Sequence, residues 1–440
     1  MRMSTVEVTD LSNPAAVTAV LDRLLAAAPQ PQPRPSLSYL RCKPGRGLVA
    51  VYGTPRDPDH LYTVRVDERG LTVQSFPDDP TLPALAAAME PGRHPALWSA
   101  LQDCAAARLP GGPTWSLAEV EAEPVRYKPG DRCVIRYRLS LHRGDGVEKT
   151  TLSVIGKLYR EPAQAEAAAA LLGRLRATAT RWCPAPLAVL DCLALMLSED
   201  LGDQQADPPT TTGTRAIRPG SPDSMHLITA AAAALAELHT CDPSVAGAGI
   251  RRGTDEAMKV AIRARLLADH FGQRPDLVHR IARVSTDVRT RLAALEPDKY
   301  RPTHGSFKPS QLLARGDAAF VVDFDQFALA DPALDIGYFL AYLRPAGLFY
   351  GRFGIRDWFE ANAITFRRSY VTALTECGVP SGEALAILRR SSVYEAALLF
   401  KIAARRPNRL HSPRPREVQA MLSEIARCLA AFDRGSISGT

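Results

Sequence analysis

The stretch His304-Gly305-Ser306-Phe307-Lys308-Pro309-Ser310-Gln311 is followed, twelve residues after Gln311, by Asp323-Phe324-Asp325. Between these two stretches lie short apolar runs at residues 312–314 and 319–322, which we predict to be strands. A carboxylate at the end of an apolar strand, as at Asp323, suits Mg²⁺, because this ion prefers oxygen ligands. The alternative for Asp323 is an exposed turn residue. The pattern therefore predicts a polar loop followed by two short strands, the second of which ends at Asp323.

The bulk composition describes an ordinary folded protein. A chain of 440 residues with 46% hydrophobic and 23% charged residues has room for two or three domains. The formal net charge is +7 and the pI is about 9.0, a balance that suits an anionic ligand. The sequence has no basic arm and no zinc-finger spacing, so we expect no nucleic-acid partner.

The cysteines are scattered and form no CxxC pair, although there are eight of them. We read them as buried thiols of a reducing compartment, with no disulfide framework and no metal site. The first ten residues are polar and acidic, unlike a signal peptide. The apolar run at residues 230–235 is too short to cross a bilayer, so we expect no membrane association and a cytoplasmic location.

A string near the N-terminus recurs 85 residues later. It follows a predicted amphipathic helix at about residues 15–28 and a proline-rich linker at residues 29–35. Six of twelve positions match: Arg41, Lys43, Pro44, Gly45, Val49 and Tyr52 align with Arg126, Lys128, Pro129, Gly130, Val134 and Tyr137. Each copy precedes a further strand and an alanine-rich helix, which suggests a duplicated hairpin-plus-helix unit. The alternative is that Lys-Pro-Gly is merely a common turn after a strand.

The rest of the chain changes from strands to helices. Residues 120–127, 133–141 and 148–159 read as three antiparallel strands, a helix begins at Pro162, and another hairpin leads to Glu199-Asp200-Leu201-Gly202. Beyond a polar loop, helices are expected at about residues 224–240, 254–270, 275–294, 356–376, 382–404 and 415–433. We therefore predict three domains: an N-terminal α+β extension at 1–115, a sheet domain at 116–202 and a helical domain at 203–440.

The order of these motifs resembles the aminoglycoside phosphotransferase/choline-kinase-like family over residues 116–345, and more weakly to the end. The resemblance implies an α+β, two-lobed protein-kinase-like fold with an antiparallel-sheet small lobe and a helical large lobe. Its landmarks are Ile155-Gly156-Lys157-Leu158-Tyr159, Ala165-Glu166-Ala167, Glu199-Asp200-Leu201, Leu235-Ala236-Glu237-Leu238-His239, the loop at 304–311, Asp323, and Asp331-Pro332-Ala333-Leu334-Asp335.

The resemblance implies that ATP binds on the sheet side. Lys157 is expected to pair with the α- and β-phosphates, and Glu166 to hold Lys157 through an ion pair. Without the resemblance, the alternative for Lys157 is a solvated lysine at the end of a strand. The alternative for Glu166 is a residue favoured near a helix N-terminus by the helix dipole. Glu199 lies in the expected connector between the lobes. Lys128 and Gly130 lie in the Lys-Pro-Gly-Asp-Arg turn, which is either a cover for the phosphates or a plain hairpin turn.

On the helical side the resemblance implies a Mg²⁺ site and a catalytic loop. Asp323 and Gln311 are the expected metal ligands, and Asp325 is a second ligand, a proton acceptor or a turn residue. Lys308 matches the lysine of protein-kinase loops and is expected to neutralise the transferring phosphate. His304 and Asp335 are expected to brace the loop.

The family pattern reads roughly HGDxHxxN, and two of the residues that normally do the chemistry are changed in this sequence. Ser306 stands where the catalytic aspartate is expected, and Gln311 stands where a metal-binding asparagine is expected. Serine is not a useful base without an activating partner, although losing a general base costs only about 10²–10⁴ in rate. Three interpretations stay open: an unusual phosphotransferase acting on a hydroxyl, a nucleotide-binding pseudokinase that scaffolds or regulates a biosynthetic partner, or a different transfer chemistry with Ser306 as nucleophile.

The acceptor cannot be read from the motifs. The phosphoryl acceptor is expected to be a hydroxyl group of either a small molecule or a peptide. Binding to a partner protein is a further possibility. Residues 356–440 contain more basic than acidic side chains, which disfavours a cationic aminoglycoside. ATP and Mg²⁺ are the ligands expected under all three interpretations.

Overall fold

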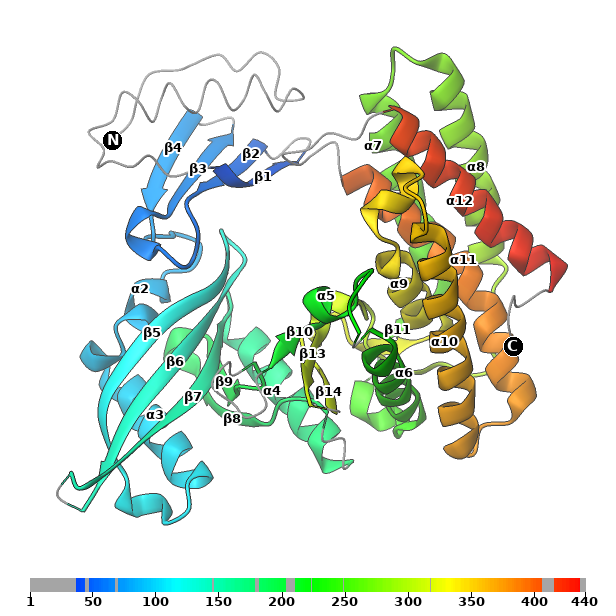
Figure 1. Ribbon diagram of the computed structural model, residues 1–440. Helices are drawn as coiled ribbons and strands as arrows, with labels where there is room; N and C mark the ends of the chain where they lie inside the picture. The colour runs from blue at the N-terminus through cyan, green and yellow to red at the C-terminus, as the bar shows by residue number, and fades with distance from the viewer. Residues whose placement is uncertain are drawn as a thin grey trace. The chain divides into compact units, whose positions relative to one another are not determined.

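The computed structural model describes residues 37–435, except residues 44–46, 68–69, 145, 179–181, 203–209, 223, 248, 317 and 406–414. The predicted helix at 15–28, its proline-rich linker, and Pro44 and Gly45 of the first Lys-Pro-Gly turn lie outside the described residues. The described chain divides into two compact units (Figure 1). The sheet unit contains the chain up to Gly173 and Ala185–Asp200; the helical unit contains Arg174–Pro184 and the chain from Leu201 onward.

The sheet unit is built on a five-stranded antiparallel sheet with strand order β5-β6-β7-β9-β8. Alternate residues of β6 are buried, from Cys133 to Leu141, because one face of the sheet covers a core. Helix α4 (Pro162–Ala177) follows β7. The strands are β5 (Ser116–Lys128), β6 (Arg132–Arg143), β7 (Glu148–Leu158), β8 (Pro186–Leu190) and β9 (Leu195–Glu199).

A second, four-stranded antiparallel sheet precedes it in the chain, with strand order β1-β2-β3-β4. The hairpin β1–β2 corresponds to the first predicted repeat, and the hairpin β5–β6 corresponds to the second. The two copies differ in one respect, because the first has one more strand before its helix than the second. The duplication stays a prediction. The elements are β1 (Leu37–Lys43), β2 (Gly47–Tyr52), η1 (Pro58–His60), β3 (Tyr62–Asp67), β4 (Gly70–Ser75), α2 (Leu85–Met89), η2 (Pro91–Arg93), α3 (Pro95–Arg108) and η3 (Gly112–Thr114).

Helices α2 and α3 pack on the five-stranded sheet. Leu85 and Leu101 share one core with Ile135, Tyr137 and Val154, whereas the four-stranded sheet has a small core of its own. Burial of this apolar surface stabilises the unit by roughly 25 cal/mol per Å². Residues on both sides of the predicted domain boundary at residue 115 therefore pack in the same core. The boundary itself stays a proposal.

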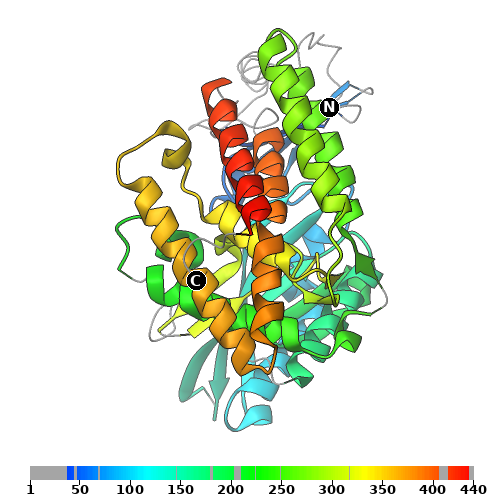
Figure 2. The same cartoon turned by 90° about the vertical axis from the view of Figure 1, so that its right-hand side faces the viewer.

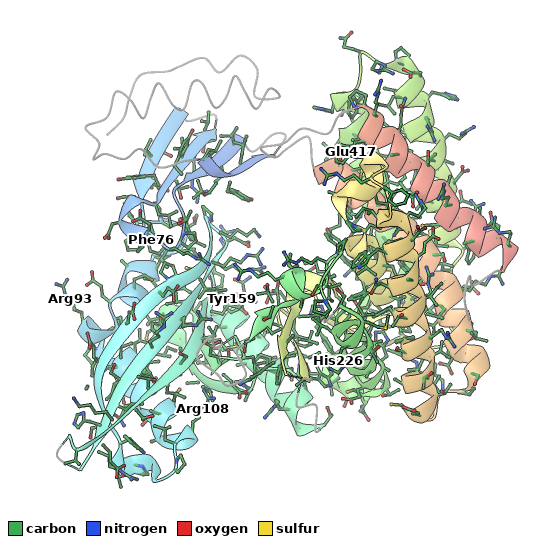
Figure 3. The ribbon with its side chains drawn as sticks, in the orientation of Figure 1. Phe76, Arg93, Arg108, Tyr159, His226 and Glu417 are labelled. Carbon is green, nitrogen blue, oxygen red and sulfur yellow. The ribbon has the colours of Figure 1, made fainter. Side chains whose placement is uncertain are left out.

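Aspartate 79 joins the two sheets of this unit. Phe76, labelled in Figure 3, meets the Tyr127 ring edge to face at 5.2 Å between centroids. The Asp79 carboxylate accepts hydrogen bonds from the Tyr127 hydroxyl (2.8 Å) and the Gly130 amide (2.7 Å), and it pairs with Arg65 of β3 (3.5 Å). The turn after β5 is thereby fixed to the preceding segment.

The helical unit contains α6, α7, α8, α10, α11 and α12 at the places where the sequence predicts helices. In Figure 2, α12 lies beside α11, and α7 lies beside α8. The elements are β10 (Thr211–Thr212), α5 (Gly213–Ala216), α6 (Ser224–Thr240), η5 (Pro243–Ala246), β11 (Ile250–Arg251), α7 (Gly253–His270), α8 (Pro275–Ala293), β12 (Arg301–Thr303), η6 (Pro309–Gln311), β13 (Leu312–Arg315), β14 (Ala318–Val321), β15 (Ala328–Ala330), α9 (Ala333–Leu343), η7 (Ala346–Tyr350), α10 (Ile355–Glu376), α11 (Ser381–Arg405) and α12 (Pro415–Arg434).

Two small sheets frame the loop at residues 304–311. One has the order β10-β13-β14 and the other the order β11-β15-β12. The predicted strands on either side of residue 317 are therefore present as the hairpin β13–β14. An antiparallel sheet in one unit and helices in the other confirm the predicted α+β class.

Among the described residues, no helix is both long enough and apolar enough to cross a membrane.

Candidate functional site

The loop at residues 304–311 is fixed at its start by Asp335, which lies in the first turn of α9. The backbone amides of His304 and Gly305 donate to the two Asp335 carboxylate oxygens, at 2.7 and 2.9 Å. His239 of α6 lies 3.4 Å from the same carboxylate. Gly305 has a φ of +74°, and a Cβ there would lie 1.9 Å from the Gln326 carbonyl oxygen. Only glycine fits at this position.

The His304 side chain connects the loop to the strand end before Asp323. Its Nε2 lies 3.2 Å from the Val322 carbonyl oxygen, and its ring packs on Phe324 at 4.7 Å between centroids. Burial lowers the pKa of His304, so the ring is neutral at pH 7 and its Nε2–H donates to the carbonyl. The predicted bracing roles of His304 and Asp335 agree with these contacts.

Gln311 brings the loop and the strand end together. Its Nε2 donates to the Ser306 hydroxyl oxygen at 3.1 Å and to the Asp323 Oδ2 at 3.2 Å. Gln311 is 3% exposed and Ser306 is 7% exposed, so both amide and hydroxyl are held away from bulk water. Three residues that the sequence singled out therefore form one hydrogen-bonded cluster.

Asp323 has a left-handed backbone, with a φ of +71°. Aspartate adopts this conformation more readily than most non-glycine residues, at a cost of about 1–3 kcal/mol. The conformation turns the chain sharply after β14 and leaves Asp323 and Asp325 half-buried on either side of buried Phe324. Phe324 in turn stacks against Trp182, at 6.2 Å between centroids.

The oxygen atoms at this cluster fit Mg²⁺. The buried Gln311 Oε1 has no hydrogen-bond partner among the described residues, and the Asp323 carboxylate lies beside the same amide group. No group of three or more His, Cys, Asp or Glu side chains that could hold a metal occurs in the described part of the chain. This donor set suits Mg²⁺ rather than zinc, because Mg²⁺ is usually held by one or two carboxylates, water and substrate phosphates.

Lys308 lies two residues beyond Ser306 and is half-buried. Its ammonium lies 5.6 Å from the centre of the Tyr342 ring of α9. The loop is also held by an arginine that the sequence analysis did not single out. Arg251 of β11 donates from Nη1 to the Gly305 carbonyl oxygen at 2.9 Å, and it pairs with buried Glu256 at 2.7 Å.

On the sheet unit, Lys157 is the second-last residue of β7 and is half-buried, with its ammonium 5.3 Å from the Tyr159 ring centre. Glu166 lies in the second turn of α4, is exposed, and makes no ion pair with the residues that the structure describes. Glu199 ends β9, pairs with Arg108 at 3.6 Å and accepts the Ala185 amide at 3.4 Å. The predicted ion pair between Lys157 and Glu166 stays a prediction.

The turn at Lys128 and Gly130 is held by carboxylates. Lys128 pairs with Asp131, and the Gly130 amide donates to Asp79. Asp79 is 3% exposed; burial raises its pKa, but hydrogen bonds from Thr81, Gly130 and Tyr127 outweigh this and hold the pKa below its usual value. The contact of the Gly130 amide favours the hairpin-turn interpretation over the phosphate-covering one. No sequence pattern marks Asp79, because its contact with Gly130 spans 51 residues.

Comparison with known families identifies a matching family. Residues 142–361, half of the chain, match the model of the family described as "Phosphotransferase enzyme family". No curated protein sequence is significantly similar to the chain.

Similar solved structures include a glucosamine kinase in complex with glucosamine, ADP and inorganic phosphate, at 17% identity and a TM-score of 0.49, covering 92% of this chain and 97% of that one. They also include choline kinase from Cryptosporidium parvum Iowa II, at 9% identity and a TM-score of 0.49, covering 77% and 97%. The macrolide 2'-phosphotransferase MphH from Brachybacterium faecium matches at 17% identity and a TM-score of 0.38, covering 71% and 98%.

Proposed function

Because the chain belongs to the phosphotransferase enzyme family, we propose that it transfers a phosphoryl group from ATP to a hydroxyl group of a small molecule or peptide. The observation that supports this most directly is the Gln311 amide, which joins Ser306 of the loop to Asp323 of the strand end. In a phosphotransferase these two places serve the acceptor and the metal. The cluster is intact although two of its side chains differ from the family pattern.

The sheet unit binds the nucleotide in this proposal. Lys157 neutralises the α- and β-phosphates, and Glu166 rotates toward Lys157 when the nucleotide binds. Lys128 and Gly130 form the hairpin turn held by Asp131 and Asp79, and Glu199 lies at the connector. Positioning and charge neutralisation supply most of the catalysis in phosphoryl transfer. The nucleotide-binding residues can therefore support transfer even though the site has no aspartate at position 306 to act as a general base.

Asp323 and Gln311 would hold Mg²⁺, through a carboxylate oxygen and the amide oxygen. When bound, the ion neutralises charge on the phosphate oxygens. Gln311 keeps Asp323 in place through the hydrogen bond that its Nε2 donates to Oδ2.

Ser306, Lys308 and Asp325 serve the acceptor. Ser306 accepts a hydrogen bond from Gln311, so its own hydroxyl hydrogen is directed elsewhere and can orient the acceptor oxygen. Lys308 neutralises the phosphoryl group, and Asp325 receives the acceptor proton. Serine as a nucleophile is disfavoured: among the described residues its hydroxyl is hydrogen-bonded only to Gln311 Nε2, which is a donor and cannot remove a proton.

The second candidate function is a nucleotide-binding pseudokinase that regulates or scaffolds a partner enzyme. The loss of the catalytic aspartate at position 306 favours it, as does the exposed position of Glu166. Both candidates place the protein in the cytoplasm, where its free cysteines would stay reduced.

The experiment that separates the two candidates is acceptor-dependent ADP formation from Mg-ATP, measured with wild type and with Asp323→Asn. A phosphotransferase forms ADP and a phosphorylated product with at least one acceptor, and Asp323→Asn removes both. Nucleotide binding without any product, over a panel of sugars, amino alcohols and serine peptides, would establish the pseudokinase instead.

A further inference from the structure

Arg251 links a buried carboxylate to the loop at residues 304–311 within the helical unit. It ends β11, which pairs in parallel with β15. Its Nε and Nη2 lie 2.8 and 2.7 Å from the Glu256 Oε1, and its Nη1 donates to the Gly305 carbonyl oxygen at 2.9 Å. Because the guanidinium group is planar and rigid, its contact with Glu256 fixes the direction in which Nη1 points.

Glu256 is a fixed anchor for this guanidinium group. It lies in the first turn of α7, and its side chain is 1% exposed. Burial raises the pKa of Glu256, but Arg251 and Lys259 outweigh this effect and hold the pKa below its usual value, so the carboxylate is charged at pH 7. Lys259 lies 2.6 Å from the same Oε1, and in the described part of the chain it makes no hydrogen bond with the loop. Of the two cations on Glu256, Arg251 is therefore the one that contacts the loop.

The backbone of Gly305 is held at both of its polar groups. Its amide donates to the Asp335 Oδ1 at 2.9 Å, and its carbonyl oxygen accepts from Arg251. The guanidinium group also lies close against this residue, since a Cβ on Gly305 would be 3.1 Å from Nη1. The carbonyl of Gly305 and the amide of Ser306 belong to one planar peptide group. Arg251 therefore sets the orientation of the peptide group from which Ser306 starts.

We propose that Arg251 is a positioning residue, which aims the side chain at position 306 toward the acceptor hydroxyl by fixing the peptide group between Gly305 and Ser306. This inference rests on the proposed function, in which position 306 orients the acceptor. Arg251 touches neither acceptor nor nucleotide and acts only through the loop backbone. The orientation matters because a displacement of about 1 Å at a reacting group can cost about 10²-fold in rate.

The alternative is that Arg251 and Glu256 form an ion pair that contributes to the fold alone. A double-mutant cycle separates the two roles, because coupling between two positions appears as a failure of their effects to multiply. Ser306→Asp places a potential general base at the end of the loop peptide, and a general base raises the rate by at least about 10²-fold only when it reaches the acceptor proton. The size of this gain therefore reports how well position 306 is aimed.

The test measures the gain in kcat from Ser306→Asp in four backgrounds of the full chain: wild type, Arg251→Met, Arg251→Lys and the matched control Lys259→Met. Methionine removes the charge and keeps much of the apolar packing of the side-chain stem. Lysine keeps the charge beside Glu256 but lacks the planar fork. The stoichiometry of Mg-ATP binding gives the folded fraction of each variant, so kcat is expressed per folded site. If Arg251→Met does not fold, Arg251→Lys carries the test.

We expect a gain of about 10²-fold in wild type and in Lys259→Met, and of about ten-fold or less in both Arg251 variants. A gain of equal size in all four backgrounds would overturn the proposal and leave Arg251 with a role in the fold only. Loss of the gain in Lys259→Met would also overturn it, because the charge balance at Glu256 would then matter rather than the contact of Arg251 with the loop.

A second arm needs no transfer activity and measures hydrogen exchange at the His304 and Gly305 amides without nucleotide. Exchange should be at least about ten-fold faster in both Arg251 variants than in wild type, and unchanged in Lys259→Met. Unchanged exchange in the Arg251 variants would refute the role of Arg251. Absence of transfer to any acceptor, in wild type and in Ser306→Asp alike, would instead refute the proposed function, while the exchange rates still decide whether Arg251 fixes the loop.

Discussion

At the scale of single residues, the site depends on a few hydrogen bonds that the sequence only partly reveals. The family resemblance implied that Gln311 and Asp323 would share a metal site, and the structure shows both of them near Ser306, because the loop and the hairpin that follows it are local in sequence. The contacts of Asp79 and Arg251 could not be predicted in this way. Each joins segments that are far apart in the chain, and a lone Asp or Arg has no periodic pattern.

Ser306 gives the first prediction. Ser306→Ala should leave the rate of phosphoryl transfer within a few-fold of wild type, because Ser306 orients the acceptor and removes no proton. Ser306→Asp should raise the rate by about 10²-fold, the lower end of the usual effect of a general base. The measurement is kcat for ADP formation with a fixed acceptor. Abolished transfer in Ser306→Ala, with nucleotide binding intact, would restore the nucleophilic interpretation.

Asp79 gives a prediction about pH. Its pKa in the folded protein lies below the value of an unfolded aspartate, about 3.9. Its contribution to the free energy of unfolding is therefore complete above pH 4 and is lost as the pH falls through the folded-state pKa. Asp79→Asn should cost about 1.5–3 kcal/mol at pH 7, because it replaces a charged acceptor of several hydrogen bonds.

The measurement is urea unfolding of Asp79→Asn at pH 7 and at pH 3. The matched control is Asp78→Asn, since Asp78 is exposed and adjacent. The difference between Asp79→Asn and wild type should shrink at pH 3, while the control stays near wild type at both values. An equal loss at pH 7 in both variants would show that Asp79 has no special role.

At the scale of elements, periodicity predicted the amphipathic helices and the half-buried strands. Strand β6 shows the clearest alternation, because one of its faces covers the core formed with α2 and α3. Helix α9 was not predicted as a helix. Ten of its eleven residues are buried, so it shows no polar stripe from which a period of 3.6 residues can be recognised.

The close packing of α9 gives the third prediction. A Cβ on Gly337 would lie 2.7 Å from the backbone nitrogen of Glu395 and 2.7 Å from the Tyr394 Cβ, both in α11. Gly337→Ala should therefore destabilise the protein by about 1–3 kcal/mol, although alanine favours helices. The measurement is the free energy of unfolding in urea.

Gly173→Ala in α4 is the matched control for this helix substitution. The nearest atom to a Cβ there is the Pro186 Cγ, at 4.0 Å. This variant should be neutral or stabilised by about 0.5–1 kcal/mol, the usual gain from replacing glycine within a helix. Equal effects of the two substitutions would contradict the packing described for α9 and α11.

At the scale of the whole molecule, the chain is a member of the phosphotransferase enzyme family and consists of a sheet unit and a helical unit. The order of motifs predicted the sheet lobe and the helical lobe. The packing of α2 and α3 on the five-stranded sheet was not predicted, because it depends on apolar residues from both sides of the expected boundary at residue 115. The N-terminal extension thus contributes to the core of the sheet lobe.

The central proposal is that binding of Mg-ATP requires both Lys157 of the sheet unit and Asp323 of the helical unit. Titration calorimetry of Mg-ATP into wild type, Lys157→Met, Asp323→Asn and the control Lys149→Met tests it most directly. Wild type and the control should bind equally, and each of the other two variants should bind at least about ten-fold more weakly, as expected for loss of a charge-assisted contact. Mg-ATP binding that is unchanged in both Lys157→Met and Asp323→Asn would contradict the account.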